Sequence, residues 1–186
     1  MITPTIETER LILKRGTFND YIKVYEYDFT RLRNISGEFE YVKLEPDNIV
    51  GFDTYADEEE NCIDFIIYLK DEMIPIGNLI YDRYKKENKS LEIAYNLHPN
   101  YWKKGYMTEA VLATMSYIFD NLDIENIRCG YADENINSKL LNERIGFQKV
   151  GYHMEHYKRI NKDVKVIDTI MSHEDFKLMY DRNKKK

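Results

Sequence analysis

The sequence has few cysteines, no long apolar run and no surplus of positive charge, and each shortage excludes a class of protein. Its two cysteines, Cys62 and Cys129, lie far apart and form no CxxC pair, so we expect buried thiols in a reducing compartment. No stretch approaches the ~18 uninterrupted apolar residues that cross a bilayer. The start MITPTIETERLILKR lacks the apolar segment of a signal peptide. We therefore predict a cytoplasmic protein with no membrane partner.

The charge balance argues against a nucleic-acid partner. The chain carries 33 acidic against 27 basic residues, a net charge of -6, which opposes non-specific attraction to polyanions. Lys103, Lys104 and the closing KKK tail are not embedded in the aromatic and basic platform that binds single strands. Nucleic-acid binding is therefore not expected.

Length and composition fit one globular domain. The chain has 186 residues, of which 43% are hydrophobic and 32% charged, and these are ordinary values for a protein with a buried core. No internal repeat or low-complexity linker divides it. We predict a single domain over residues 1–186.

The first half of the chain predicts strands joined by short turns. Residues 9–15 alternate as a strand, and Thr17 caps a helix that follows it. Three strands at 62–70, 74–84 and 90–97 are separated by short polar turns, which predicts an antiparallel meander.

The weakly patterned region between Arg31 and Glu60 is interpreted as a short helix plus loop. Its acidic run Asp57 to Glu60 is typical of a solvated loop. The functional alternative is a negative rim that attracts a cationic amine, together with Glu38, Glu40 and Glu45.

In the second half of the chain, the spacing of apolar residues changes from a period of two to a period of about 3.6. A stripe of apolar residues predicts a helix over 107–122, and the strand at 126–132 makes the unit a strand, helix, strand crossover with parallel strands. A second helix is predicted at 138–145, with Asn137 as N-cap and Gly146 at its end. Strands at 147–158 and 164–172 and a helix from Ser172 complete a mixed α/β fold.

The segment HPNYWKKGYMTEA, residues 98–110, predicts an anion site. Gly105 supplies backbone freedom where the amphipathic helix begins, so unpaired N–H groups converge just past the end of a strand. The helix dipole and the charges of Lys103 and Lys104 favour a phosphate there. A turn glycine with solvated lysines is the simpler alternative. The segment is neither a Walker A loop nor a GxGxxG fingerprint.

Several segments together resemble the GCN5-related N-acetyltransferases (GNAT). These are, in order, RLILKR, strand 90–97, YWKKGYMTEA, strand 126–132, Asn135 and Ser138 in NxxS, ERIGF and the closing NKDVKVIDTIMS hairpin. Within that superfamily the sequence is similar to the ribosomal-protein amino-terminal acetyltransferase group. The resemblance covers essentially the whole chain and implies a GNAT-like fold in which the central strands splay apart.

The resemblance implies that acetyl-coenzyme A lies in that splay, with no metal. The pantetheine arm would bond the backbone of Tyr95, Asn96 and Leu97 like an added strand. The pyrophosphate would contact the amides of five consecutive residues: Lys104, Gly105, Tyr106, Met107 and Thr108. Asn135 would bond the pantetheine, and Ser138 would lie near the thiol end or on the adenylate side. Lys139 or Arg144 would approach the 3'-phosphate.

Three positions depart from the family pattern. Trp102 and Met107 stand in the loop where the general pattern has a glutamine or arginine and a small residue, and Met107 would narrow the approach to the pyrophosphate. Asn142 stands where many members carry a tyrosine general acid, so that route is closed.

Acetyl transfer to an amine needs a base, a polarised carbonyl and a proton for the thiolate. Glu92 is the candidate base, with a solvent-facing or ion-paired structural role as the alternative. The N–H of Asn96 or Leu97 would polarise the carbonyl. Ser138, Tyr95 or Tyr131 would supply the proton, and the sequence does not choose among them. No covalent intermediate is required.

His153, His156 and Asp168 are not expected to carry chemistry. The two histidines are three residues apart on a strand and so point to opposite faces, which argues against a metal site. Asp168 is expected to be structural.

The predicted function is transfer of an acetyl group directly from the thioester to a primary amine. A peptide amino terminus, a polyamine and an aminoglycoside-like amine all remain candidate acceptors. A non-catalytic module that binds or senses acyl-coenzyme A is the competing hypothesis. Oligomeric state is open, with a homodimer among the alternatives.

Overall fold

The computed structural model describes residues 1–25, 33–34, 37–38, 62–157 and 161–184. The acidic run 57–60, with Glu40 and Glu45, lies outside these residues, as does most of the region interpreted as a short helix plus loop. Its described part contains a pair of two-residue strands, β3 (Arg33–Asn34) and β4 (Gly37–Glu38), and no helix.

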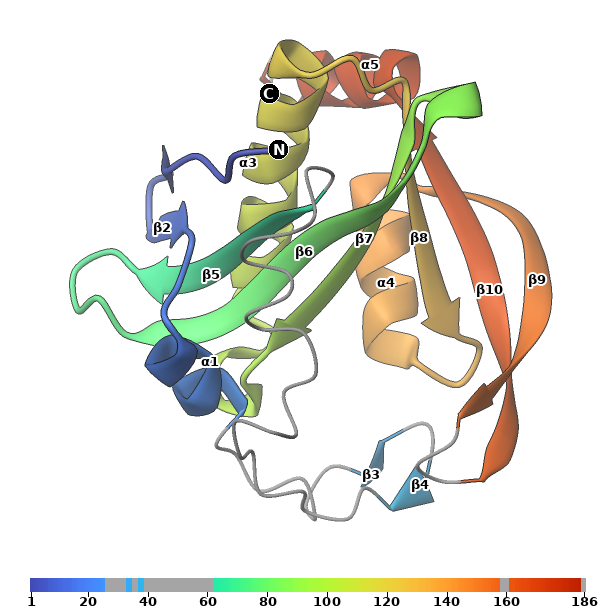
Figure 1. The fold of residues 1–186 in the computed structure, drawn as a ribbon, viewed down its shortest axis with the longest axis horizontal. Helices are drawn as coiled ribbons and strands as arrows, with labels where there is room; N and C mark the ends of the chain where they lie inside the picture. The colour runs from blue at the N-terminus through green and yellow to red at the C-terminus, as the bar shows by residue number, and fades with distance from the viewer. Residues whose placement is uncertain (26–32, 35–36, 39–61, 158–160, 185–186) are drawn as a thin grey trace.

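The elements follow the chain order predicted from periodicity (Figure 1). The helices are α1 (Phe18–Tyr25), α3 (Tyr106–Asn121), α4 (Ile136–Ile145) and α5 (His173–Lys184). The strands are β1 (Ile6–Glu7), β2 (Leu11–Lys14), β3 (Arg33–Asn34), β4 (Gly37–Glu38), β5 (Ile63–Leu69), β6 (Pro75–Lys85), β7 (Ser90–Leu97), β8 (Asn126–Ala132), β9 (Gln148–Tyr157) and β10 (Lys162–Ser172).

Eight of the described strands form one large mixed sheet in the order β1-β2-β5-β6-β7-β8-β10-β9, and β3 and β4 form a separate two-stranded sheet. β5, β6 and β7 pair antiparallel in succession, which confirms the predicted meander. β7 and β8 pair parallel with α3 as the crossover helix, as the change of period indicated. This is the GNAT-like mixed α/β architecture.

The parallel pairing of β7 and β8 covers only one end of each strand. It runs from Ser90 opposite Asn126 to Glu92 opposite Arg128 and then stops. β7 continues to Leu97 and β8 to Ala132, and Figure 1 shows the two strands moving apart over this stretch. The predicted splay of the central strands is therefore present.

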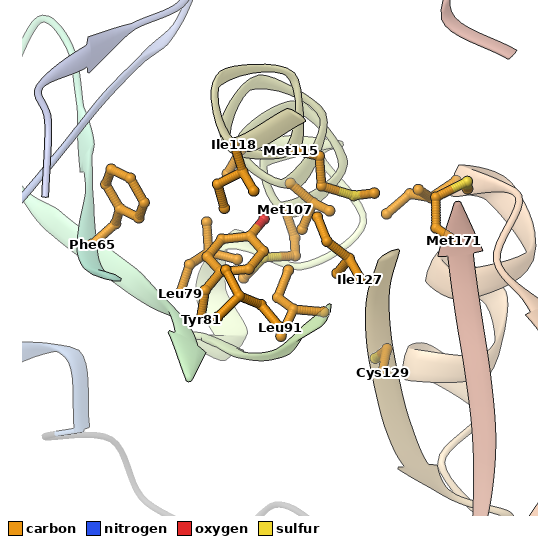
Figure 2. Packing of buried hydrophobic residues seen from close by; sticks show 14 of the residues in the cluster. Phe65, Leu79, Tyr81, Leu91, Met107, Met115, Ile118, Ile127, Cys129 and Met171 are labelled. Carbon is orange, nitrogen blue, oxygen red and sulfur yellow. The ribbon is translucent and has the colours of Figure 1, made fainter. Parts of the chain in front are cut away.

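Helices cover both faces of the sheet because the meander strands are apolar on both sides. Phe65 and Ile67 of β5 join the cluster beneath α3, whereas Ile66 packs with Tyr21 and Val24 of α1. Figure 2 shows Met107, Met115 and Ile118 of α3 packed over the side chains of β6 and β7. The predicted stripe on α3 is buried, and so the position of its first turn is fixed by the core.

Side-chain caps fix where three helices begin. Thr17 exchanges hydrogen bonds with Asp20 at the start of α1, and the Ser172 hydroxyl accepts from the Asp175 N–H. The predicted N-cap Asn137 is wrong. Asn135 caps α4 instead, because its Oδ1 accepts from the Ser138 N–H at 2.9 Å and starts the helix two residues earlier.

One buried hydrogen bond joins the sheet to α3. The hydroxyls of Tyr81 (β6) and Thr114 (α3) are 2.7 Å apart, and both residues are fully buried. Thr114 also donates to the Ala110 carbonyl at 2.9 Å. The Thr114 hydroxyl therefore keeps a partner if the Tyr81 hydroxyl is removed, whereas Thr114 is the one partner that the described residues give the Tyr81 hydroxyl.

We predict that Thr114→Val destabilises the protein more than Tyr81→Phe does. Thr114→Val leaves a buried hydroxyl unsatisfied and should cost about 1–3 kcal/mol, against roughly 1 kcal/mol for Tyr81→Phe. The double variant should be no less stable than Thr114→Val, because the unsatisfied group is gone. Urea unfolding monitored by circular dichroism measures all three, and equal costs for the two single variants would contradict the asymmetry.

Candidate active site

The turn before α3 leaves a run of backbone amides without partners at the start of the helix. Gly105 is the N-cap of α3 and adopts the left-handed region with φ 82°, and Lys103 precedes it at φ 60°. The first helical hydrogen bond runs from the Glu109 N–H to the Gly105 carbonyl at 3.0 Å. The amides of Tyr106, Met107 and Thr108 therefore have no acceptor within the helix, as the sequence predicted. This is the geometry of an anion site.

A cavity of about 410 Å³ opens in front of these amides. Its walls come from the end of β7, the turn before α3, the first turn of α3 and one side of α4 from its N-cap to Arg144. Ten of the predicted cofactor residues line it: Tyr95, Asn96, Leu97, Lys103, Gly105, Tyr106, Met107, Thr108, Asn135 and Ser138. The volume lies in the range of small-molecule sites.

Two loop residues are placed differently from the expectation. Lys104 is not among the cavity-lining residues, and its Nζ lies 5.4 Å from the centre of the Tyr101 ring. Met107 lines the cavity, yet its side chain is 7% exposed and belongs to the core (Figure 2). Because that side chain is directed into the core, Met107 does not fill the space in front of its own amide.

Asn135 and Ser138 lie together at the start of α4, and both line the cavity. The cap bond occupies Oδ1 of Asn135, so its NH₂ group is the donor left for a ligand. Arg144, one turn and a half further along α4, also lines the cavity, and its Nη1 reaches the Thr108 hydroxyl at 3.5 Å. Lys139 does not line it.

Asn142, which stands where many family members carry a tyrosine, is the centre of a buried polar network. Asn142 is 2% exposed, and its Nδ2 donates to the Tyr95 hydroxyl at 3.0 Å and to the Ser138 carbonyl at 2.9 Å. Its Oδ1 accepts from Thr169 at 2.9 Å, and Cys129 Sγ lies 3.6 Å from Nδ2. The network places the Tyr95 hydroxyl between β7 and α4, where the strands have separated.

Burial sets the protonation of this network. Desolvation first, and then the charge of Cys129, raise the pKa of Tyr95 well above its ordinary value, so the hydroxyl keeps its proton at neutral pH. Desolvation also raises the pKa of Cys129 to about 11. Because the thiolate is the reactive form, Cys129 is an inert thiol at neutral pH. Cys62 is also buried, and neither cysteine forms a disulfide.

Glu92 lies where β7 and β8 begin to separate, and it does not line the cavity. Its carboxylate forms ion pairs with Arg83 at 3.0 Å and with Arg128 at 3.3 Å, and its side chain is 24% exposed. The structure therefore places it in the ion-paired setting that the sequence offered as an alternative. Its role as a base stays a prediction.

The other polar candidates pair with each other. His153 contacts Asp168 at 3.0 Å across β9 and β10, and His156 contacts Asp163 at 2.7 Å. Within the described part of the chain, no group of three or more histidine, cysteine, aspartate or glutamate side chains is arranged to hold a metal ion. None of the described helices is long and apolar enough to span a membrane.

Sequence reasoning missed a contact between the chain's start and the anion site. Arg10, just before β2, forms an ion pair with Glu109 in the first turn of α3, and its Nη1 donates to the Lys104 carbonyl at 3.0 Å. The two side chains are 99 positions apart, so no local pattern could join them. The available signal was that both residues fall in segments that carry the family resemblance.

Comparison with known proteins identifies the family. Residues 10–148 match the model of the acetyltransferase (GNAT) domain, so the chain belongs to the GNAT family and is an acyltransferase. It is 33% identical over 153 residues to p20, an N-acetyltransferase of Bacillus licheniformis, covering 79% of this chain and 84% of p20.

Solved structures show the same fold. A GNAT-family acetyltransferase from Bacillus anthracis superposes with a TM-score of 0.73 at 27% identity, covering 92% of this chain and 99% of that one. Spermidine N-acetyltransferase from Vibrio cholerae, solved in complex with CoA and spermine, superposes with a TM-score of 0.73 at 19% identity, covering 91% and 99%.

We predict that Gly105→Val weakens coenzyme A binding roughly tenfold or more, because a β-branched residue at φ 82° is strained and will distort the amides that follow. Gly105→Asn is the matched control, since asparagine tolerates the left-handed region, and it should lose much less affinity. Isothermal titration calorimetry measures both. Equal affinities for Gly105→Val and wild type would contradict the anion site.

Proposed function

We propose that this protein transfers the acetyl group of acetyl-coenzyme A to a primary amine. The observation that carries the proposal is the group of unpaired α3 amides at a cavity that is also lined by the end of β7, where β7 no longer pairs with β8. One end of this cavity suits a diphosphate and the other suits an amide-bearing chain that bonds like an added strand. Coenzyme A carries both groups in that order.

The cofactor lies with its pyrophosphate on the amides of Tyr106, Met107 and Thr108. Its pantetheine arm then runs along Tyr95 and Asn96 of β7, with the Asn135 NH₂ group donating to it from α4. The Leu97 carbonyl already accepts from the Trp102 indole at 2.6 Å, so it is not the first acceptor available to the pantetheine. Arg144, which lines the cavity, supplies positive charge for the 3'-phosphate.

The reaction needs no covalent enzyme intermediate. The neutral amine nitrogen attacks the thioester carbonyl carbon, the carbon–nitrogen bond forms, and the carbon–sulfur bond breaks. The amine gives up one proton and the departing thiolate takes one. The N–H of Asn96 or Leu97 polarises the carbonyl, and Tyr95 or Ser138 supplies the proton to sulfur.

Tyr95 is the better placed of the two proton donors. Its hydroxyl is held by Asn142, the residue that replaces the family's usual tyrosine, and it interacts with the Ser138 side chain. Burial keeps it protonated, which a general acid requires. Tyr95 on β7 thus serves as the general acid, the role that many relatives give to a tyrosine on α4.

Glu92 is proposed as the base that prepares the amine, acting directly or through water. Its place at the point of strand separation brings it near the thioester end of the site, while Arg83 and Arg128 hold its carboxylate in position. Removal of a positioned base costs on the order of 10²-fold in rate or more.

Two classes of acceptor have specific support. Spermidine is the substrate named for one protein of the same fold, at an identity that speaks for the fold alone. A peptide amino terminus is the acceptor implied by the resemblance to the ribosomal-protein acetyltransferases. An aminoglycoside-like amine is the third candidate.

A panel of amines tests the proposal. Thiol release from acetyl-coenzyme A is measured with amino-terminal peptides, polyamines and aminoglycosides, beside calorimetry with coenzyme A alone. We expect binding of coenzyme A and release with at least one class. Binding without release for every acceptor would favour an acyl-coenzyme A sensor, and absence of binding would overturn the proposal.

We predict that Tyr95→Phe lowers kcat by about 10²-fold with little change in the affinity for coenzyme A, because the proton donor is lost while the ring remains. Ser138→Ala is the comparison and should retain most of the rate. Steady-state kinetics with the best acceptor of the panel measures both. The reverse order of effects would assign the proton to Ser138.

We predict that Glu92→Gln lowers kcat at neutral pH with the affinity for coenzyme A retained. Glu125→Gln is the matched control, because that carboxylate is also ion-paired, with Lys89 at 3.1 Å, but it precedes β8, at the end where β7 and β8 are still paired. An unchanged rate for Glu92→Gln would leave Glu92 a structural role only.

A further inference from the structure

Arg10 contacts the anion-binding turn on both sides of Gly105. Its Nε and Nη2 bind the same carboxylate oxygen of Glu109, at 2.7 Å and 2.6 Å, and its Nη1 donates to the Lys104 carbonyl at 3.0 Å. The guanidinium also lies 4.6 Å from the centre of the Tyr106 ring. One side chain thus touches the residue before the glycine and two residues after it.

Both oxygens of Glu109 are used in this contact. Oε1 accepts from the Thr8 hydroxyl at 2.7 Å and from the Arg10 N–H at 3.0 Å, while Oε2 receives the guanidinium. Burial by itself would raise the pKa of Glu109, but the hydrogen bonds from Thr8 and Arg10, with the charge of Arg10, lower it. Glu109 is therefore ionised throughout the neutral range.

An ionised Glu109 poses a problem for an anion site. It lies in the first turn of α3, beside the amides of Tyr106, Met107 and Thr108. A carboxylate there stabilises the helix start, but it repels a diphosphate that uses the same amides. A guanidinium bonded to that carboxylate offsets the repulsion, because the pair is close to neutral as seen from the cavity.

We propose that Arg10 is a positioning residue for the diphosphate of the cofactor, which it favours by fixing the Lys103–Tyr106 turn and by neutralising Glu109. Arg10 does not line the cavity, so it acts through these residues and not by direct contact. The inference rests on the proposed binding of coenzyme A. It adds a determinant of affinity from the residue before β2, a strand that β5 and β6 separate from β7 in the sheet.

Paired ligands separate this role from a general loss of structure. Binding of coenzyme A and of pantetheine, which has no pyrophosphate, is measured by calorimetry or ligand-detected NMR for wild type and Arg10→Gln. We expect Arg10→Gln to weaken coenzyme A binding at least tenfold and to change pantetheine binding by less than twofold. Arg10→Lys keeps the charge without the fork of donors, so its affinity for coenzyme A should fall between those of wild type and Arg10→Gln.

The Glu109→Gln change tests the electrostatic half of the proposal. In the Arg10→Gln background it removes the exposed negative charge, so the double variant should regain at least threefold of the lost coenzyme A affinity. Circular dichroism checks the fold of each variant. If Arg10→Gln does not fold, the same pair of ligands with Arg10→Lys decides.

The outcomes are distinct. Wild type that fails to bind coenzyme A overturns the proposed function itself. Wild type that binds, with Arg10→Gln binding equally well, overturns the role of Arg10 and leaves the function standing. Equal losses for coenzyme A and pantetheine would make Arg10 merely structural, and no recovery in the double variant would remove the electrostatic contribution.

Discussion

The site depends on the point at which β7 and β8 stop pairing. Two adjacent parallel strands normally satisfy each other's backbone groups, but here the register ends at Glu92 and Arg128. Beyond it the edge of β7 that faced β8 no longer pairs with that strand, and a ligand that bonds like a strand can take its place. The core under α3 holds β7, and α4 packs over β8, so the gap is maintained by elements on both sides.

The start of α3 adds charge selectivity to that gap. The buried stripe of α3 fixes the helix against the sheet, and the left-handed Gly105 allows the chain to enter it directly from the turn. Residues of this first turn and of the end of β7 line the same cavity, so the helix and the sheet together shape one site.

The order of most elements and the start of α3 could be predicted from local patterns, because each pattern lies within a few residues. The stripe from Met107 to Ile118 and the alternation in β7 are of this kind, and so is the glycine at a helix start. The choice between Asn135 and Asn137 as cap could not be made locally, since both are good caps and the turn after β8 decides. The contacts of Asn142 with Tyr95 and of Arg10 with Glu109 join distant segments and became visible only in the fold.

The network around Asn142 shows how a departure from a family pattern is absorbed. An asparagine cannot protonate a thiolate, but its amide satisfies the Tyr95 hydroxyl, the Ser138 carbonyl and Thr169 at once. A buried polar group that is fully bonded stiffens its surroundings. The substitution therefore leaves an ordered polar centre between β7 and α4.

The ion pair between Arg10 and Glu109 also has an evolutionary consequence. Two positions 99 residues apart are expected to be inherited together, because replacing either one alone leaves the charge of the other without its ion-pair partner. Descendants of this lineage will therefore tend to keep both residues or to replace both. Recombination between relatives that brings in Arg10 from one parent and Glu109 from another will be selected against when the two parents differ at these positions.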